Sequence, residues 1–206
     1  MRARRTPPFV EVGLALLLLL AVTACASPPR PYEPRLVHVP SDEAYEHPHS
    51  NVQFTPRARA LLRSDIVEHD EQGFGGSAYY RSPMFGATAE ANFYPGTRDE
   101  QLDESEVREH LAVLESAIVH SLPGARIVDE QEDTWVVNGS ELRGYHAAWA
   151  LSQLEDVDEE MESHLYLFPT GSWYLEFRIM YPADMSEDVA PQIARFLDAQ
   201  WWNEGE

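Results

Sequence analysis

Few residues of this chain have both the type and the spacing that chemistry requires. His47 and His49 lie two positions apart, and Asp42, Glu43 and Glu46 precede them. Alternate residues of an extended segment share a face, and imidazole and carboxylate groups are ligands for copper or zinc. The segment has no H-E-x-x-H helix and no third histidine at a fixed spacing. His47 and His49 are therefore candidates for a metal site, with a polar domain edge as the alternative.

Two further segments resemble functional loops without meeting their requirements. Residues 73–77 (Gly-Phe-Gly-Gly-Ser) lack the Lys-Ser/Thr pair of a phosphate loop, and Tyr79 stands where a nucleophile elbow needs its last glycine. The acidic run 155–162 lacks the glycine of a calcium-binding EF-hand loop. We expect a turn into a strand and a solvated loop, respectively. The sequence predicts no enzyme and no cofactor; a hydrolase assembled from dispersed Ser, His and Asp residues stays a remote alternative.

A pair of tryptophans lies close to the end of the chain. Trp201 and Trp202 follow the apolar stripe of the last predicted helix. One of them is expected to close the core. An exposed second tryptophan would be an anchor for a binding partner, because tryptophan is enriched at interface hot spots.

The N-terminus has the pattern of a leader peptide. Arginines precede an unbroken apolar run from Val12 to Val22. As a helix this run would be about 16 Å long, which is too short for a hydrocarbon core of about 30 Å. It matches the apolar region of a signal peptide.

Residues 22–25 (Val-Thr-Ala-Cys) resemble the bacterial lipobox. The resemblance implies that residues 1–24 are a signal peptide, that the Cys25 thiol carries a diacylglycerol, and that its new amine is acylated. The diacylglycerol and the acylated amine together supply enough acyl chains for stable membrane anchoring. Ala26 stands where an Asp would favour the inner membrane, which points to the outer membrane, facing the periplasm. The alternative is an ordinary secretory signal with a chance cysteine.

The charge of the chain restricts its partners. All 15 basic residues are arginines, against 35 acidic residues, for a net charge of −20. A phosphate backbone would be repelled, so nucleic acid is excluded as a partner. The single cysteine excludes an intramolecular disulfide and a cysteine-based zinc site.

Composition divides the mature chain into a tether and a domain. Four prolines between Ser27 and Pro34 predict an extended, semi-rigid segment. We assign residues 25–45 to the lipidated cysteine and this tether, and residues 46–206 to a single domain.

Hydrophobic periodicity predicts the elements of that domain. Short alternating runs predict strands at 52–54, 66–67, 77–80 and 87–93. Asp103 begins a helix whose stripe runs from Val107 to Leu122. Hairpins follow around Asn138-Gly139 and around residues 169–171, and a last helix covers about 188–202.

This order resembles the PsbP-like family, several members of which are bacterial lipoproteins. The supporting features are residues 76–79, the helix that ends at residues 122–124, Asn138-Gly139 and the strand 173–177. The resemblance implies an α+β fold in which two helices pack on one face of a twisted antiparallel sheet. The family is not enzymatic as a class and supplies no catalytic residues. We therefore expect an outer-membrane lipoprotein that binds an envelope protein or component, with a small-ligand or metal-binding carrier as the alternative.

Overall fold

The structure is a computed structural model, and it describes residues 32–50, 52–97, 100–122, 124–137, 140–152 and 159–202. These residues belong to one compact unit, residues 32–206. No helix in the described ranges is both long enough and apolar enough to cross a bilayer.

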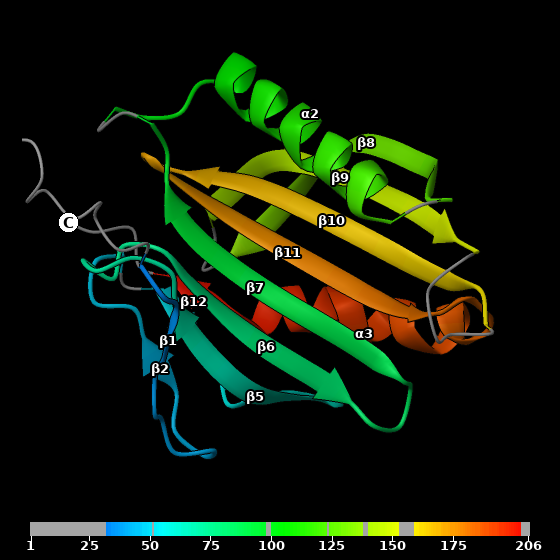
Figure 1. Cartoon of the computed structure of the whole chain (residues 1–206), viewed down its shortest axis with the longest axis horizontal. Helices are drawn as coiled ribbons and strands as arrows, with labels where there is room; N and C mark the ends of the chain where they lie inside the picture. Colours follow the sequence, from blue (N-terminus) through cyan, green and yellow to red (C-terminus); the bar gives the residue numbers. More distant parts are fainter. Residues whose placement is uncertain are drawn as a thin grey trace, which may run out of the picture. The chain divides into compact units, whose positions relative to one another are not determined.

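A large antiparallel sheet dominates this unit (Figure 1). Its strands follow the order β1-β5-β6-β7-β11-β10-β9-β8, and β4 pairs beside β5. A small second sheet has the order β12-β3-β2. The strands are β1 (Arg35–Leu36), β2 (Tyr45–Glu46), β3 (Val52–Phe54), β4 (Arg57–Ala58), β5 (Leu61–Glu68), β6 (Gly76–Ser82), β7 (Ala87–Pro95), β8 (Arg126–Val137), β9 (Ser140–Leu151), β10 (Met161–Thr170), β11 (Trp173–Pro182) and β12 (Trp201–Trp202).

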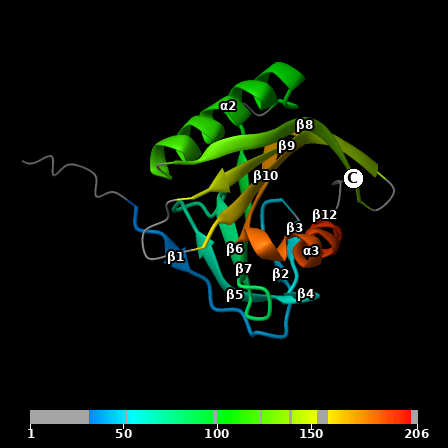
Figure 2. The same ribbon diagram turned by 90° about the vertical axis from the view of Figure 1, so that its right-hand side faces the viewer.

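The expected α+β fold, with two helices on one face of the sheet, is wrong. The described chain is mostly β-sheet, and its two longer helices, α2 (Glu104–Ser121) and α3 (Ser186–Ala199), lie on opposite faces (Figure 2). The stripe of α2 packs with Tyr145, Trp149 and Leu165, whereas that of α3 packs with Phe177 and neighbouring side chains. The described residues therefore form two hydrophobic cores, one on each side of the sheet.

Burial on both faces of the central strands explains this arrangement. In β11, Leu175 and Phe177 contribute to the core under α3, while Tyr174 contributes to the core under α2. The prediction that one face would stay wet follows from the usual habit of antiparallel sheets. The run Ala147–Leu151 is apolar at every position, and such a run indicates a strand covered on both sides.

The sequence correctly located the first predicted helix. The Asp103 side chain accepts a hydrogen bond from the Glu106 backbone N–H, and the Glu106 side chain accepts one from the Asp103 N–H, so the two form a capping box. The buried residues of α2 are Val107, Leu111, Leu114 and Ile118, as the spacing predicted.

The ends of the domain differ from the sequence prediction. Arg35 and Leu36 pair with β5, so the sheet includes residues that the composition assigned to the tether. The last helix ends at Ala199 rather than at Trp202, and the tryptophans form β12, which pairs with β3.

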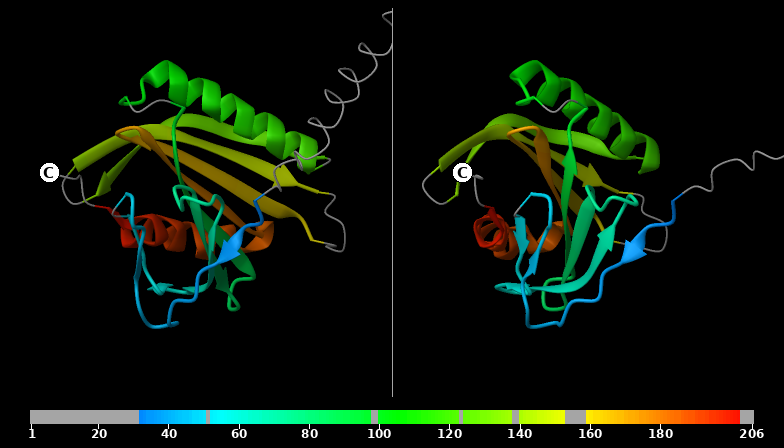
Figure 3. Two further views of the ribbon diagram at one scale, coloured as in Figure 1. Left: turned by 60° about the vertical axis from the view of Figure 1, so that its left-hand side comes forward. Right: turned by 90° about the vertical axis from the view of Figure 1, so that its left-hand side faces the viewer.

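The hairpin of β8 and β9 bends away from the sheet at Gly144. The pairing of β9 with β10 ends at Tyr145, whereas β9 continues to pair with β8 as far as Ser140. Beyond the bend, Trp135 packs against Phe168 and Phe177 in the core under α3. The curved strands of this hairpin are visible in Figure 3.

Candidate functional site

The structure brings His47 and His49 close together, in the connection between β2 and β3. Their ring centroids are 5.9 Å apart. His47 is fully buried, its Nδ1 lies 2.8 Å from Ser50 Oγ, and its ring contacts Phe93. Burial lowers the pKa of His47. His49 bonds the Gln72 carbonyl instead, and the described residues contain no group of three or more His, Cys, Asp or Glu side chains placed to hold a metal ion.

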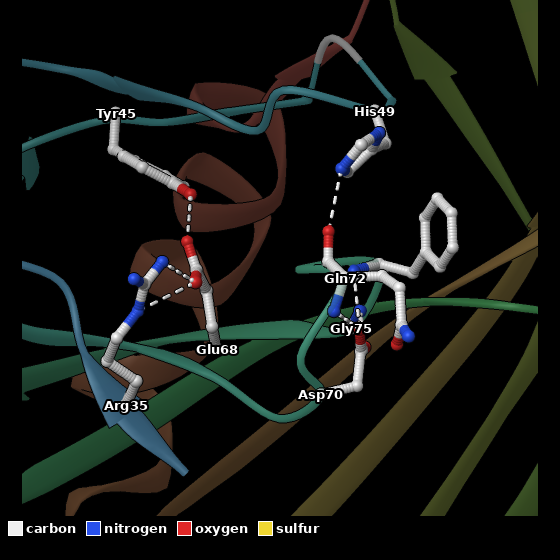
Figure 4. A network of polar contacts seen from close by, with 8 residues as sticks. Arg35, Tyr45, His49, Glu68, Asp70, Gln72 and Gly75 are labelled. Atoms are coloured by element: carbon white, nitrogen blue, oxygen red, sulfur yellow. Dashed lines mark hydrogen bonds and ion pairs between the residues drawn. The ribbon is translucent and has the colours of Figure 1, made fainter.

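The glycine-rich segment forms a turn into a strand, as predicted. Asp70 organises the turn by accepting hydrogen bonds from the N–H groups of Gln72, Phe74 and Gly75 (Figure 4). Beside it, Glu68 binds Arg35 at 2.5 Å and accepts a hydrogen bond from Tyr45. The backbone N–H groups of this turn therefore already donate to the Asp70 carboxylate and are not available to bind a phosphate.

A serine–histidine pair that the sequence did not reveal lies next to this turn. His69 Nε2 is 2.6 Å from Ser77 Oγ. The Ser77 hydroxyl donates its proton to Asn92 Oδ1, so it accepts from His69. A nucleophilic serine needs the reverse arrangement, in which histidine takes the hydroxyl proton. Ser77 is also fully buried, so this geometry does not support the hydrolase alternative.

The pair begins a buried polar chain across the sheet. Asn92 Nδ2 donates to Glu176, which also accepts hydrogen bonds from Tyr94, at 2.5 Å, and from Arg178. Tyr94 OH in turn lies 2.8 Å from Nε2 of His110 on α2. Glu176 is 2% exposed, and three donors satisfy its carboxylate. We interpret this series of hydrogen bonds as a structural network that holds α2 against the sheet.

A second histidine pair lies on the α3 face. His146 Nε2 is 2.9 Å from His164 Nδ1, and the two rings are stacked. His164 Nε2 lies 2.7 Å from Tyr181 OH, which donates to Glu162. Because that hydroxyl has only one proton, His164 donates to Tyr181 and accepts from His146. His164 is then neutral, and Asp129 lies 3.7 Å from Nδ1 of His146.

This histidine pair predicts a pH-dependent stability. Burial lowers the pKa of both His146 and His164. The unfolded chain therefore binds protons more readily, and the free energy of unfolding should fall as the pH drops below about 6.5. Urea unfolding from about pH 7.5 to about pH 5.5 should show this loss, which should shrink in a His146→Gln/His164→Gln variant.

The comparison between the unchanged chain and the His146→Gln/His164→Gln variant is essential. Protonation of carboxylates at low pH relieves self-repulsion in an acidic chain, and this raises the free energy of unfolding where protonation of the histidines lowers it. Equal pH slopes for the two proteins would contradict the role of the pair.

A large groove lies on the α2 face of the sheet. α2 covers β9 and β10, but beside its C-terminal end the strands β5, β6 and β7 remain uncovered. The hollow has a volume of about 740 Å³, and carbon atoms form most of its lining. Ile118 of α2 and Leu122, its C-cap, form one wall, Met180 of β11 lies on the floor, and Leu36 and Val67 form the far side.

Charged groups of both signs lie among these apolar residues. Arg81 lies 3.9 Å from Asp65, and both line the groove. Arg178 and Glu90 line it as well. Burial and the nearby Glu90 carboxylate raise the pKa of Tyr79, which keeps the phenol neutral. The groove therefore offers an apolar surface together with separate positive and negative groups.

No single sequence signal indicates this groove, because its walls come from β1, β5, β6, β7, β10, β11 and α2. The site residues proposed from sequence lie elsewhere. Cys25 is outside the described residues, and so are residues 155–158 of the acidic run 155–162. Trp201 and Trp202 pair with β3 through their backbones, and the structure does not describe their side chains.

Sequence comparisons add no relative to these observations: no protein-family model matches the chain, and no curated protein matches it either.

Proposed function

We propose that this chain is a lipid-anchored, non-enzymatic binding protein of the bacterial cell envelope, and that the groove holds an amphipathic small molecule. The observation that carries the proposal is the combination of a large apolar hollow with charges of both signs. Ligand sites have this character: a concave, mostly apolar lining with a few placed polar groups. The two cations and two anions suit a ligand whose polar head carries both signs.

The position of the groove relative to the proposed anchor supports a ligand drawn from the membrane. Leu36 lines the groove and follows Cys25 by only eleven positions. Such a segment spans at most about 40 Å even when fully extended. A lipid attached to Cys25 would therefore keep the groove within this distance of the membrane, on the outer-membrane surface that faces the periplasm.

The hydrolase alternative has no support from the geometry, because Ser77 is buried and already donates its proton. Carriage of a metal by His47 and His49 is not supported either, since no third His, Cys, Asp or Glu among the described residues is placed to complete a site with them. The carrier alternative remains in the form of a small amphipathic ligand.

Photo-crosslinking in living cells tests the proposal on the full chain. A photoreactive side chain at Ala117, which is exposed and lines the groove, should capture a lipid-like molecule that mass spectrometry can identify. The same group at Val119 is the matched control, because Val119 is 47% exposed but does not line the groove. Thr88→Trp should fill the groove and reduce the adduct at Ala117 by about tenfold.

Equal labelling at Ala117 and Val119 would show that the groove has no preference for a ligand. Adducts only to proteins at Ala117 would refute the small-molecule version of the proposal.

A further inference from the structure

β8 lies at one edge of the large sheet, where the Thr134 N–H donates to the Asp133 side chain. It is twelve residues long and, among the described residues, pairs only with β9. Figure 2 shows β8 and β9 together beside α2. The unpaired N–H and C=O groups of such an edge are a template for another strand, so natural proteins usually cover or guard it.

The side chains along β8 form a distinctive pattern. Its middle carries the carboxylates Asp129, Glu130, Glu132 and Asp133, against one cation, Arg126. Exposed apolar side chains lie at both ends: Ile127 and Val128 are 43% and 50% exposed, and Val136 is 56% exposed.

The acids of β8 lie on both faces of the sheet. Glu130 and Glu132 pair with Ala147 and Tyr145, whose side chains face α2. Asp129 and Asp133 alternate with them and therefore point to the other face. A strand added beside β8 would meet carboxylates on each of its two faces.

This pattern excludes a second copy of the chain as the partner. In an antiparallel pairing of β8 with itself, the acidic middles would oppose each other, and like charges directly opposite are destabilising. Arg108 and His146 are the cationic or titratable groups near these acids, at 3.4 Å from Glu132 and 3.7 Å from Asp129. The charges alone would be sufficient to prevent unwanted strand pairing at this edge. Such protection does not explain why aliphatic side chains are exposed at both ends of β8.

We propose that β8 binds an extended segment of another envelope protein by strand addition, and that this segment has a basic centre between apolar flanks. Main-chain hydrogen bonds would supply affinity, while the alternating side chains would supply specificity. This surface is separate from the groove, so the proposal does not depend on the ligand of the groove.

A second hollow next to β8 suits the long side chains of such a segment. It lies between the N-terminal end of α2 and the β8–β9 hairpin, and its volume is about 480 Å³. Its lining includes Asp103, Glu104, Glu132 and Glu141, with Arg143 as the cation among the residues that line it. An arginine or lysine side chain from the added strand would meet mainly carboxylates there.

The test uses the full chain and a synthetic peptide with an arginine-rich centre between valine and isoleucine residues. The peptide should bind saturably, measured by fluorescence anisotropy, and should slow hydrogen exchange of β8 amides. A version with alternate N-methylated amides keeps every charge but cannot form the ladder, so it should bind at least about tenfold more weakly. A peptide with glutamates in place of the arginines should not bind.

Protein variants separate strand addition from general attraction to an acidic surface. Glu130→Gln/Glu132→Gln should weaken binding by about three- to tenfold. The matched control, Glu187→Gln/Asp188→Gln, removes the same charge from the first turn of α3 and should leave binding unchanged. Equal binding of the N-methylated peptide, equal weakening by both double variants, or no saturable binding would each overturn the proposal.

Discussion

Replacing Gly144 by alanine is expected to destabilise the fold by about 3 kcal/mol or more. A Cβ at this position would lie 2.2 Å from the Leu167 carbonyl oxygen and 2.5 Å from a ring carbon of Phe168. Neither a backbone carbonyl nor a buried ring can move aside without disturbing the sheet. Urea unfolding followed by tryptophan fluorescence should show the loss as a lower midpoint with little change in slope.

Gly171→Ala is the matched control for this prediction. Gly171 has a φ of +62°, and nothing lies within 4 Å of its ideal Cβ. Its replacement should cost about 1–2 kcal/mol, from backbone strain alone. A loss for Gly144→Ala no greater than that for Gly171→Ala would mean that β9 does not bend against β10 as described.

Gly144 also illustrates what the sequence could and could not predict. A lone glycine inside a strand often marks a bend or the close approach of another backbone. Nothing in the sequence tells which backbone approaches it, because Leu167 belongs to the following strand. Local features such as the helix start at Asp103 and the buried stripe of α2 depend on near neighbours and were predicted correctly.

The covering of the sheet was the part that local reasoning missed. The positions of α2 and α3 on opposite faces depend on how the whole sheet curves. The apolar stripe of one helix carries no information about this curvature. The burial of Glu176 had the same cause: its donors Asn92, Tyr94 and Arg178 come from β7 and β11, and their pairing requires the strand order. The groove and the edge of β8 likewise arise only when distant segments meet, so the sequence could not predict these surfaces.

Replacing Cys25 by alanine is expected to move the protein almost completely from the membrane fraction to the soluble periplasmic fraction. The reason is energetic: each buried CH₂ of an acyl chain contributes about 0.8 kcal/mol to membrane binding. The domain has no comparable attraction of its own, since its net charge is strongly negative and anionic lipid surfaces would repel it. Fractionation with immunoblotting, together with the intact mass of the mature protein, measures both the location and the lost lipid.

Ala26→Asp is the matched variant for this experiment, because it keeps Cys25 and alters only the adjacent residue. It should stay membrane-bound but shift toward the inner membrane, since an aspartate after the lipidated cysteine favours retention there. The two variants therefore separate anchoring from sorting. Membrane association of a Cys25→Ala protein whose leader has been removed would contradict the anchor, and it would also remove the argument that the groove is held within about 40 Å of the bilayer.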